Sequence, residues 1–182
     1  MSTSLLYHAF RISNVEYRST RYVGNSIVFK AEMSTSAKSC SSCCSSVVIF
    51  KGKKTRFLHL PPVGRKRCVL ELITHRLLCK NCGRLFWPRL QFMNGNRRYT
   101  CSFALTVLDL LQFATIRAVA DYLNVGWDMI KEIHKLKLSR IYKKQRLSNL
   151  TYLGIDEFST QKGHKYMTIF VDLQTGRIIH AI

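Results

Sequence analysis

The chain has 182 residues, which is enough for one medium-sized domain or two small ones. It contains 29 lysines and arginines against 10 acids, for a formal net charge of +19, and it has seven cysteines. No apolar run is long enough to span a membrane and the N-terminus lacks a signal-peptide pattern, so we expect an intracellular, cytoplasmic protein. In a reducing compartment, cysteines are better suited to metal binding than to disulfides.

The basic residues are concentrated in two segments. Residues 33–108 contain fourteen lysines and arginines and one acid, Glu71, and residues 129–155 contain seven and one acid, Glu132. Such a concentration attracts polyanions and releases counterions when a phosphate backbone binds. The charge therefore favours a nucleic acid as the partner, although ribosomal and membrane-surface proteins can have a similar composition.

Residues 1–95 predict a small β-rich domain. Apolar, β-branched and aromatic residues gather in segments that predict strands at 11–17, 26–32, 47–50, 55–60 and 67–77. Turns are predicted at Gly24-Asn25 and around Gly64.

Two Cys-x-x-Cys pairs lie in this domain, Cys40 with Cys43 and Cys79 with Cys82. This spacing lets two thiolates on one tight turn bind the same tetrahedral zinc ion. We therefore predict a zinc-ribbon-like site with these four ligands, in which Cys44 is an alternative to Cys43. The other interpretation is that they are buried structural thiols. A zinc ion would stabilise a region whose own core is small.

Residues 96–147 change to a helical period. Apolar spacing predicts helices over 103–112, 116–123 and 127–137. The predicted caps are Ser102 and Thr115 at two helix starts and Asn124 at the end of the second helix. A short turn would set the last two helices near a right angle, as in a helix-turn-helix. The alternative is a plain three-helix bundle with a solvated basic face.

The third predicted helix has polar residues on the side away from its apolar positions. In a helix-turn-helix the major groove would face these side chains, which are Trp127, Lys131, His134 and Lys135. The basic segment that follows would contact DNA phosphates without reading bases, through Lys143, Lys144 and Arg146.

Residues 148–182 predict strands at 151–155 and 167–171, with a hairpin turn at 172–176. Asp156 ends a strand that we expect to be buried, where an ionised carboxylate needs a partner such as a divalent metal. The alternative is a strand-end aspartate bonded to a neighbouring amide.

The order of these parts resembles one family. The paired Cys-x-x-Cys turns and the helix-turn-helix pattern are followed by Gly-Ile-Asp-Glu-Phe-Ser at 154–159, Lys-Gly-His-Lys-Tyr at 162–166 and Asp-Leu-Gln-Thr-Gly-Arg at 172–177. Together they resemble bacterial insertion-sequence transposases with an N-terminal zinc-finger domain and a DDE catalytic domain of RNase H-like fold. The resemblance implies an α+β chain of three parts, the last being the first strands of an incomplete RNase H-like domain. It also implies that Asp156 is the first acid of a triad that holds Mg²⁺ or Mn²⁺ in the intact family enzyme.

By this resemblance the chain is expected to be the DNA-binding part of a transposase, truncated before its catalytic site is complete and unable to cleave DNA by itself. Its expected partner is double-stranded DNA at insertion-sequence terminal repeats, which it could bind as a homodimer. Its expected location is the bacterial cytoplasm, in association with the nucleoid. The alternatives are a non-enzymatic zinc and helix-turn-helix regulator and a zinc-ribbon RNA or ribosome binder.

Overall fold

The computed structural model describes residues 5–34, 39–142, 147, 150–161, 163 and 165–182. The protein contains both helices and strands, with strands predominating, and it separates into two compact units, Met1–His134 and Lys135–Ile182. Of the helices in the described ranges, none is both long and apolar enough to cross a membrane.

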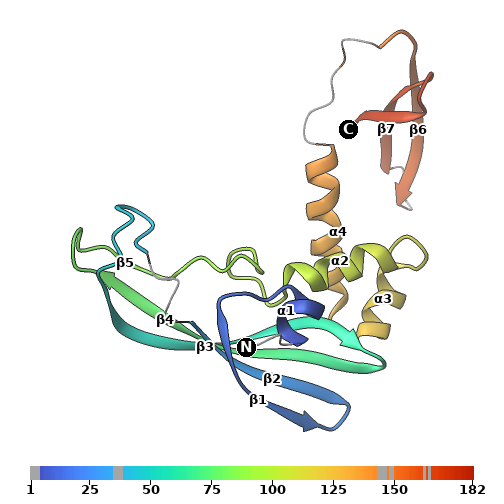
Figure 1. The fold of residues 1–182 in the computed structure, drawn as a ribbon. Coiled ribbons are helices and arrows are strands. Elements are labelled where there is room, and N and C mark those ends of the chain that lie inside the picture. The colour runs from blue at the N-terminus through green and yellow to red at the C-terminus, as the bar shows by residue number, and fades with distance from the viewer. Residues whose placement is uncertain (1–4, 35–38, 143–146, 148–149, 162, 164) are drawn as a thin grey trace. The chain divides into compact units, whose positions relative to one another are not determined.

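A mixed sheet of five strands lies in the first unit (Figure 1). Its elements are α1 (Leu5–Phe10), β1 (Val15–Val23), β2 (Ser26–Met33), β3 (Val48–Val63), β4 (Lys66–Cys79) and the short β5 (Leu85–Phe86). The strand order is β1-β2-β4-β3, in which β2 and β4 are parallel and β5 pairs with the end of β4. Strands β1 and β3 are therefore the two edges of the sheet.

Helix α1 covers one face of this sheet. Burial alternates along β2 and β4 because successive side chains point to opposite faces of a pleated strand. The buried face packs against Leu6 and Phe10, which are one turn apart on α1, and against Phe92 and Met93. Helix α1 was not predicted from the sequence, because its six residues are too few for a clear helical period.

The predicted strands at 26–32 and 67–77 match β2 and β4. The prediction at 11–17 is displaced, because residues 11–14 connect α1 to β1 and the strand continues to Val23. The two predicted strands at 47–50 and 55–60 are one strand, β3, with a bulge between Phe50 and Gly52. Its two prolines, Pro61 and Pro62, are tolerated because an edge strand can lack backbone donors.

Three helices complete the first unit and lead into the second: α2 (Cys101–Leu110), α3 (Ile116–Leu123) and α4 (Trp127–Ile141). Thr115 caps α3 as predicted, since its hydroxyl accepts a hydrogen bond from the Ala118 N–H at 3.2 Å. Asn124 ends α3 in the predicted left-handed conformation, with φ of 51°. The helices share a core of Tyr99, Phe103, Val107, Val119, Ala120, Leu123, Ile130 and Ile133.

The predicted cap of α2 is wrong. Thr100, which is fully buried, caps this helix, and its hydroxyl accepts a hydrogen bond from the Phe103 N–H at 3.3 Å. Ser102 instead lies inside the first turn, where its hydroxyl bonds that of Thr100 at 3.0 Å. The buried position of Thr100 depends on tertiary contacts that a local sequence pattern does not contain.

The second unit contains an antiparallel sheet of β6 (Leu153–Gln161), β7 (Lys165–Asp172) and β8 (Arg177–Ala181), in that order. The predicted turn before β8 forms. Asp172 accepts hydrogen bonds from the Gln174 N–H at 3.0 Å and the Thr175 hydroxyl at 2.7 Å, and Gly176 has φ of 67°. Most side chains of this sheet are exposed or half-buried.

Candidate metal centre and DNA-binding helix

The two Cys-x-x-Cys pairs meet at one end of the β3–β4 hairpin. The first pair lies before β3 and the second at the end of β4 and in the turn after it. The Sγ atoms of Cys40, Cys43, Cys79 and Cys82 all lie within 4.8 Å of one another, with 3.6 Å between Cys40 and Cys82 and 3.5 Å between Cys43 and Cys79. Tetrahedral zinc with bonds of about 2.3 Å would hold its sulfurs about 3.8 Å apart. The four thiols can therefore hold one metal ion.

The two cysteine turns have the same backbone hydrogen bonds. In each turn, the first cysteine donates its N–H to a carbonyl five residues later and accepts at its own carbonyl from an N–H four residues later. The donor–acceptor pairs are Cys40–Ser45, Cys44–Cys40, Cys79–Arg84 and Gly83–Cys79, at 2.9, 2.9, 2.9 and 3.0 Å. Cys44 and Gly83 occupy the equivalent position and have φ of 57° and 70°. Cys44 is thus a turn residue, and it is Cys43 that lies with the other three cysteines.

Backbone N–H groups favour the thiolate form of two of these cysteines. The pKa of Cys40 is lowered to about 6, chiefly by the backbone N–H of Cys43, and the N–H of Cys82 lowers the pKa of Cys79. The N–H of Arg84 also lowers the pKa of Cys82, but the neighbouring thiols outweigh it and raise this pKa to about 12. Four thiolates this close repel one another unless a cation lies among them, so the donor set suits a metal ion.

A small core supports the cysteine cluster. Cys40 and Cys79 are buried against Leu77 and Phe86, and β5 pairs with β4 at these same two apolar residues. Four protein ligands would fill a tetrahedral shell and leave no position for a substrate, which is typical of a structural rather than a catalytic zinc site.

Helix α4 separates its apolar and polar residues as the sequence predicts. Ile130 and Ile133 are buried in the helical core, whereas Trp127 and Lys131 are exposed on the other side. The Lys131 ammonium lies 5.2 Å from the centroid of the Trp127 ring, a cation–π contact across one helical turn. These two residues form a joint exposed surface.

The remaining predicted DNA-contacting residues have different environments. Lys135 is exposed on α4, one turn after Lys131, whereas His134 is half-buried. The other three, Lys143, Lys144 and Arg146, lie outside the described residues.

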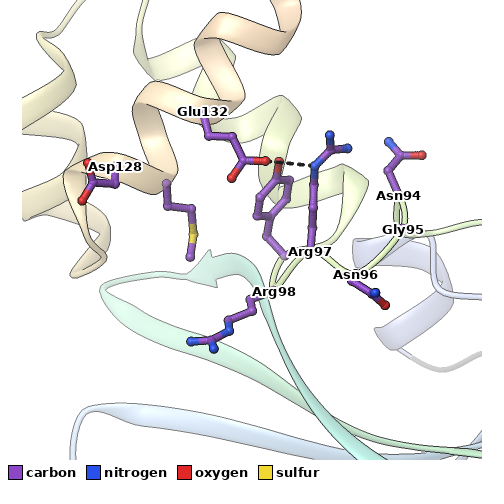
Figure 2. A pocket seen from close by; sticks show the side chains of 9 residues that line it. Asn94, Gly95, Asn96, Arg97, Arg98, Asp128 and Glu132 are labelled. Carbon is purple, nitrogen blue, oxygen red and sulfur yellow. Dashed lines mark hydrogen bonds and ion pairs between the residues drawn. The ribbon is translucent and has the colours of Figure 1, made fainter.

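A loop whose role was not predicted from the sequence packs beside α4. Residues 94–98 read Asn-Gly-Asn-Arg-Arg, and the Arg97 guanidinium donates from Nε to the Glu132 carboxylate at 3.1 Å. This pair helps to line a cavity of about 630 Å³. Figure 2 shows Asp128 on the same helix as Glu132, and Arg98 extending away from the pair. The Asn-Gly-Asn segment before two arginines indicates a turn in the sequence. It does not indicate that this turn contacts α4, because that contact depends on the tertiary fold.

His59 joins the sheet to the helices. Its N–H donates to the Arg98 carbonyl at 2.8 Å, and its carbonyl accepts from the Thr100 N–H at 3.1 Å. Burial chiefly, together with the positive charges of Arg67 and Arg98, lowers the pKa of His59 to about 4. The His59 ring is therefore neutral at pH 7, and Nδ1 lies 3.4 Å from Arg67 Nη2.

We expect this neutral histidine to make the protein less stable in mild acid. Its pKa is about 4 in the folded protein and about 6.5 when unfolded, so the unfolded chain binds more protons between these values. The free energy of unfolding should fall as the pH drops from about 6.5 to 4, by about 1–2 kcal/mol after allowance for partial solvent exposure. The free energy of unfolding, measured with urea across this pH range, should depend less steeply on pH in His59→Asn than in the wild-type protein. An identical pH dependence in both proteins would contradict the prediction.

Asp156 is exposed on β6, so the predicted burial of its strand is wrong. The described part of its unit contains one three-stranded sheet and no second sheet that could bury it. Its carboxylate accepts a hydrogen bond from the Glu157 N–H at 2.8 Å, the neighbouring-amide arrangement considered as the alternative. Among the described residues, the four cysteines form the one group of three or more metal-binding side chains close enough to share an ion.

Comparison with known proteins gives sequence relatives of one kind. The chain is 32% identical over 133 residues, 73% of its length, to the transposase for insertion sequence element IS1001 of Bordetella parapertussis. It is 31% identical over 84 residues, 46% of its length, to the transposase for insertion sequence element IS1557 in two strains of Mycobacterium tuberculosis, CDC 1551 / Oshkosh and H37Rv. No family model matches the chain, and no solved structure does.

The matched regions cover 32% of the IS1001 transposase and 19% of the IS1557 transposases. The chain thus corresponds to about a third or less of the relatives that it matches. By sequence, it is a relative of the insertion-sequence transposases.

Proposed function

We propose that this chain is the DNA-binding part of an insertion-sequence transposase and recognises the terminal repeats of its element. The observation that carries this proposal is the similarity to the IS1001 transposase over 73% of the chain. The formal charge of +19 supports it, because a phosphate backbone is the polyanion that such a transposase would contact.

In this proposal, residues 96–147 form a helix-turn-helix domain. The left-handed Asn124 between α3 and α4 supports this, as does the core in which Ala120 of α3 and Ile130 of α4 are buried together. Helix α4 would then read the major groove, chiefly through Trp127 and Lys131. The further contacts in this proposal are His134 and Lys135 to the groove and Lys143, Lys144 and Arg146 to phosphates.

The four cysteines would bind a structural zinc ion that stabilises the β-rich domain, residues 1–95. The sulfur distances and the lowered pKa of Cys40 support this assignment. Zinc is preferred to harder cations because an all-thiolate tetrahedral shell suits it. This domain would hold the DNA-binding helices in position.

Residues 148–182 would supply the first strands of an RNase H-like catalytic domain. Asp156 is then the first acid of a DDE triad, and the intact enzyme would bind Mg²⁺ or Mn²⁺ with two more acids. The exposure of Asp156 and its bond to the next amide leave one carboxylate oxygen available for such an ion.

Binding to the element's own DNA ends tests the proposal. Fluorescence anisotropy should give a dissociation constant for the purified chain on a terminal-repeat duplex that is lower than on a scrambled duplex of equal length, at a stated salt concentration. Equal affinity for both duplexes would overturn the proposal. Preferential binding of a symmetric palindrome as a dimer would instead favour a regulator.

We expect the chain by itself not to nick DNA. A two-metal site needs several convergent carboxylates, whereas Asp156 belongs to no group of three or more metal-binding side chains among the described residues. Supercoiled plasmid carrying the terminal repeats should remain supercoiled with Mg²⁺ or Mn²⁺ at protein concentrations that saturate binding. Nicking by the wild-type chain that is lost in Asp156→Asn would contradict this expectation.

A further inference from the structure

A second groove lies on the other side of the 94–98 loop, within the first unit. It has a volume of about 490 Å³ and is lined by Lys54, Thr55, Arg56, Phe57 and Leu58 of β3 and by Asn96, Arg97 and Arg98 of the loop. The cavity beside α4 described above is lined by the same loop but also by Asp128 and Glu132. The β3 groove has no acid among its lining residues, so its potential is more positive.

Three of the four cations that line the β3 groove have no acidic partner within the described structure. Arg97 is paired with Glu132, but no ion pair to a carboxylate is formed in the described ranges by Lys54, Arg56 or Arg98. On β1 of the same sheet, by contrast, Arg18 pairs with Glu32 and Arg21 with Glu71. In the part of the chain that the structure describes, the groove thus brings three unpaired cations together in one concave site whose lining contains no acid.

Arg56 both holds the two walls of the groove together and contributes positive charge to it. Its Nη2 donates to the carbonyls of Arg97 at 3.3 Å and Gly95 at 3.5 Å, which ties the loop to the strand. Burial lowers the pKa of this guanidinium, which indicates a charge partly removed from water without an anionic partner. A phosphate oxygen is a suitable partner for such a group.

An edge strand often has lysines that prevent pairing with other sheets. That role explains single lysines on β3, but it does not require arginines on the facing loop or a concave space between the two. A groove with cations on both walls and no acid fits a linear anion.

We propose that this groove binds the phosphodiester backbone of double-stranded DNA and so adds a second contact to that of α4. The inference rests on the proposed DNA-binding function. Because its contacts are to phosphate, it should raise affinity for every sequence without changing base preference.

The test uses the full chain and the variant Lys54→Gln/Arg98→Gln, which keeps Arg56 and therefore the loop. The control is Arg18→Gln/Arg21→Gln, which removes the same charge from the opposite edge of the sheet, where both arginines are paired. The salt dependence of binding, as the slope of log K against log salt, should become shallower by about two for the groove variant. The control should change the slope by clearly less.

The groove variant should lose affinity for the terminal repeat and for scrambled DNA by the same factor, about tenfold to a hundredfold at 0.1 M salt. Ethylation interference should show phosphate contacts that are lost in the groove variant but kept in Lys131→Ala, whose lost contact is to a base. An unchanged slope in a groove variant that keeps its circular dichroism spectrum would overturn the inference, as would stronger wild-type binding to duplex RNA. A wild-type chain that binds no DNA would overturn the proposed function itself.

Discussion

Replacing Cys79 and Cys82 together by serine should abolish metal binding and unfold the end of the β3–β4 hairpin. The wild-type chain should purify with about one zinc ion, and the double variant with nearly none. Structural zinc contributes about 10–16 kcal/mol of apparent binding free energy in zinc-finger peptides, so the loss should far exceed that of an ordinary core substitution. Elemental analysis and thermal unfolding measure the two effects.

Cys44 provides the matched control for this experiment. It is adjacent to Cys43 but is exposed and occupies the left-handed turn position that glycine fills in the second cysteine turn. Cys44→Gly should keep the zinc ion and leave stability unchanged or raise it by up to about 1 kcal/mol, because glycine adopts this conformation without strain. Zinc retained by the Cys79→Ser/Cys82→Ser variant, or lost from Cys44→Gly, would contradict the assignment of ligands.

Lys131→Ala should reduce the preference for the terminal repeat rather than binding in general. A lost base contact costs about 1–3 kcal/mol on the cognate sequence, which is about tenfold to a hundredfold in the dissociation constant. Trp127→Ala should have a related effect, because the Trp127 ring lies against the Lys131 ammonium and holds its position. Affinities on cognate and scrambled duplexes at the same salt concentration give the specificity ratio.

Arg117→Ala is a suitable comparison for the α4 variants. Arg117 lies on α3, is 78% exposed in its side chain and pairs with Asp121 of the same helix, so its removal changes the charge without touching α4. It should leave the specificity ratio unchanged. If Lys131→Ala weakened binding to cognate and scrambled DNA by equal factors, α4 would not be the helix that reads bases.

The sequence predicted best those features that depend on neighbouring residues. The cysteine spacing indicated which four thiols share a site, because two ligands on one tight turn need only local geometry. Thr115 and Asn124 were likewise recognisable as the ends of α3, because capping is a property of a few adjacent residues.

Features that depend on distant contacts were not predicted. Thr100 caps α2 because it is buried between helix and sheet, and no local pattern distinguishes it from Ser102. The exposure of Asp156 depends on which elements pack against its strand. An apolar run in the sequence does not specify those elements. The pairing of Arg97 with Glu132 joins residues 35 positions apart. Such contacts follow from the packing of the whole unit.

A metal ion on the cysteine cluster at one end of the β3–β4 hairpin would also favour one alignment of the two strands. In the observed alignment Val48 lies opposite Cys79, and further along the hairpin Arg56 lies opposite Leu72 and His59 opposite Val69. A slip of one residue would turn the side chains of a strand to the other face of the sheet and so withdraw Cys79 from the other ligands. A metal ion bound by the four cysteines would therefore disfavour misaligned hairpins. It would thereby also fix the positions of Arg56, which holds the 94–98 loop, and of His59, which bonds to the N-cap of α2, at the other end of the hairpin.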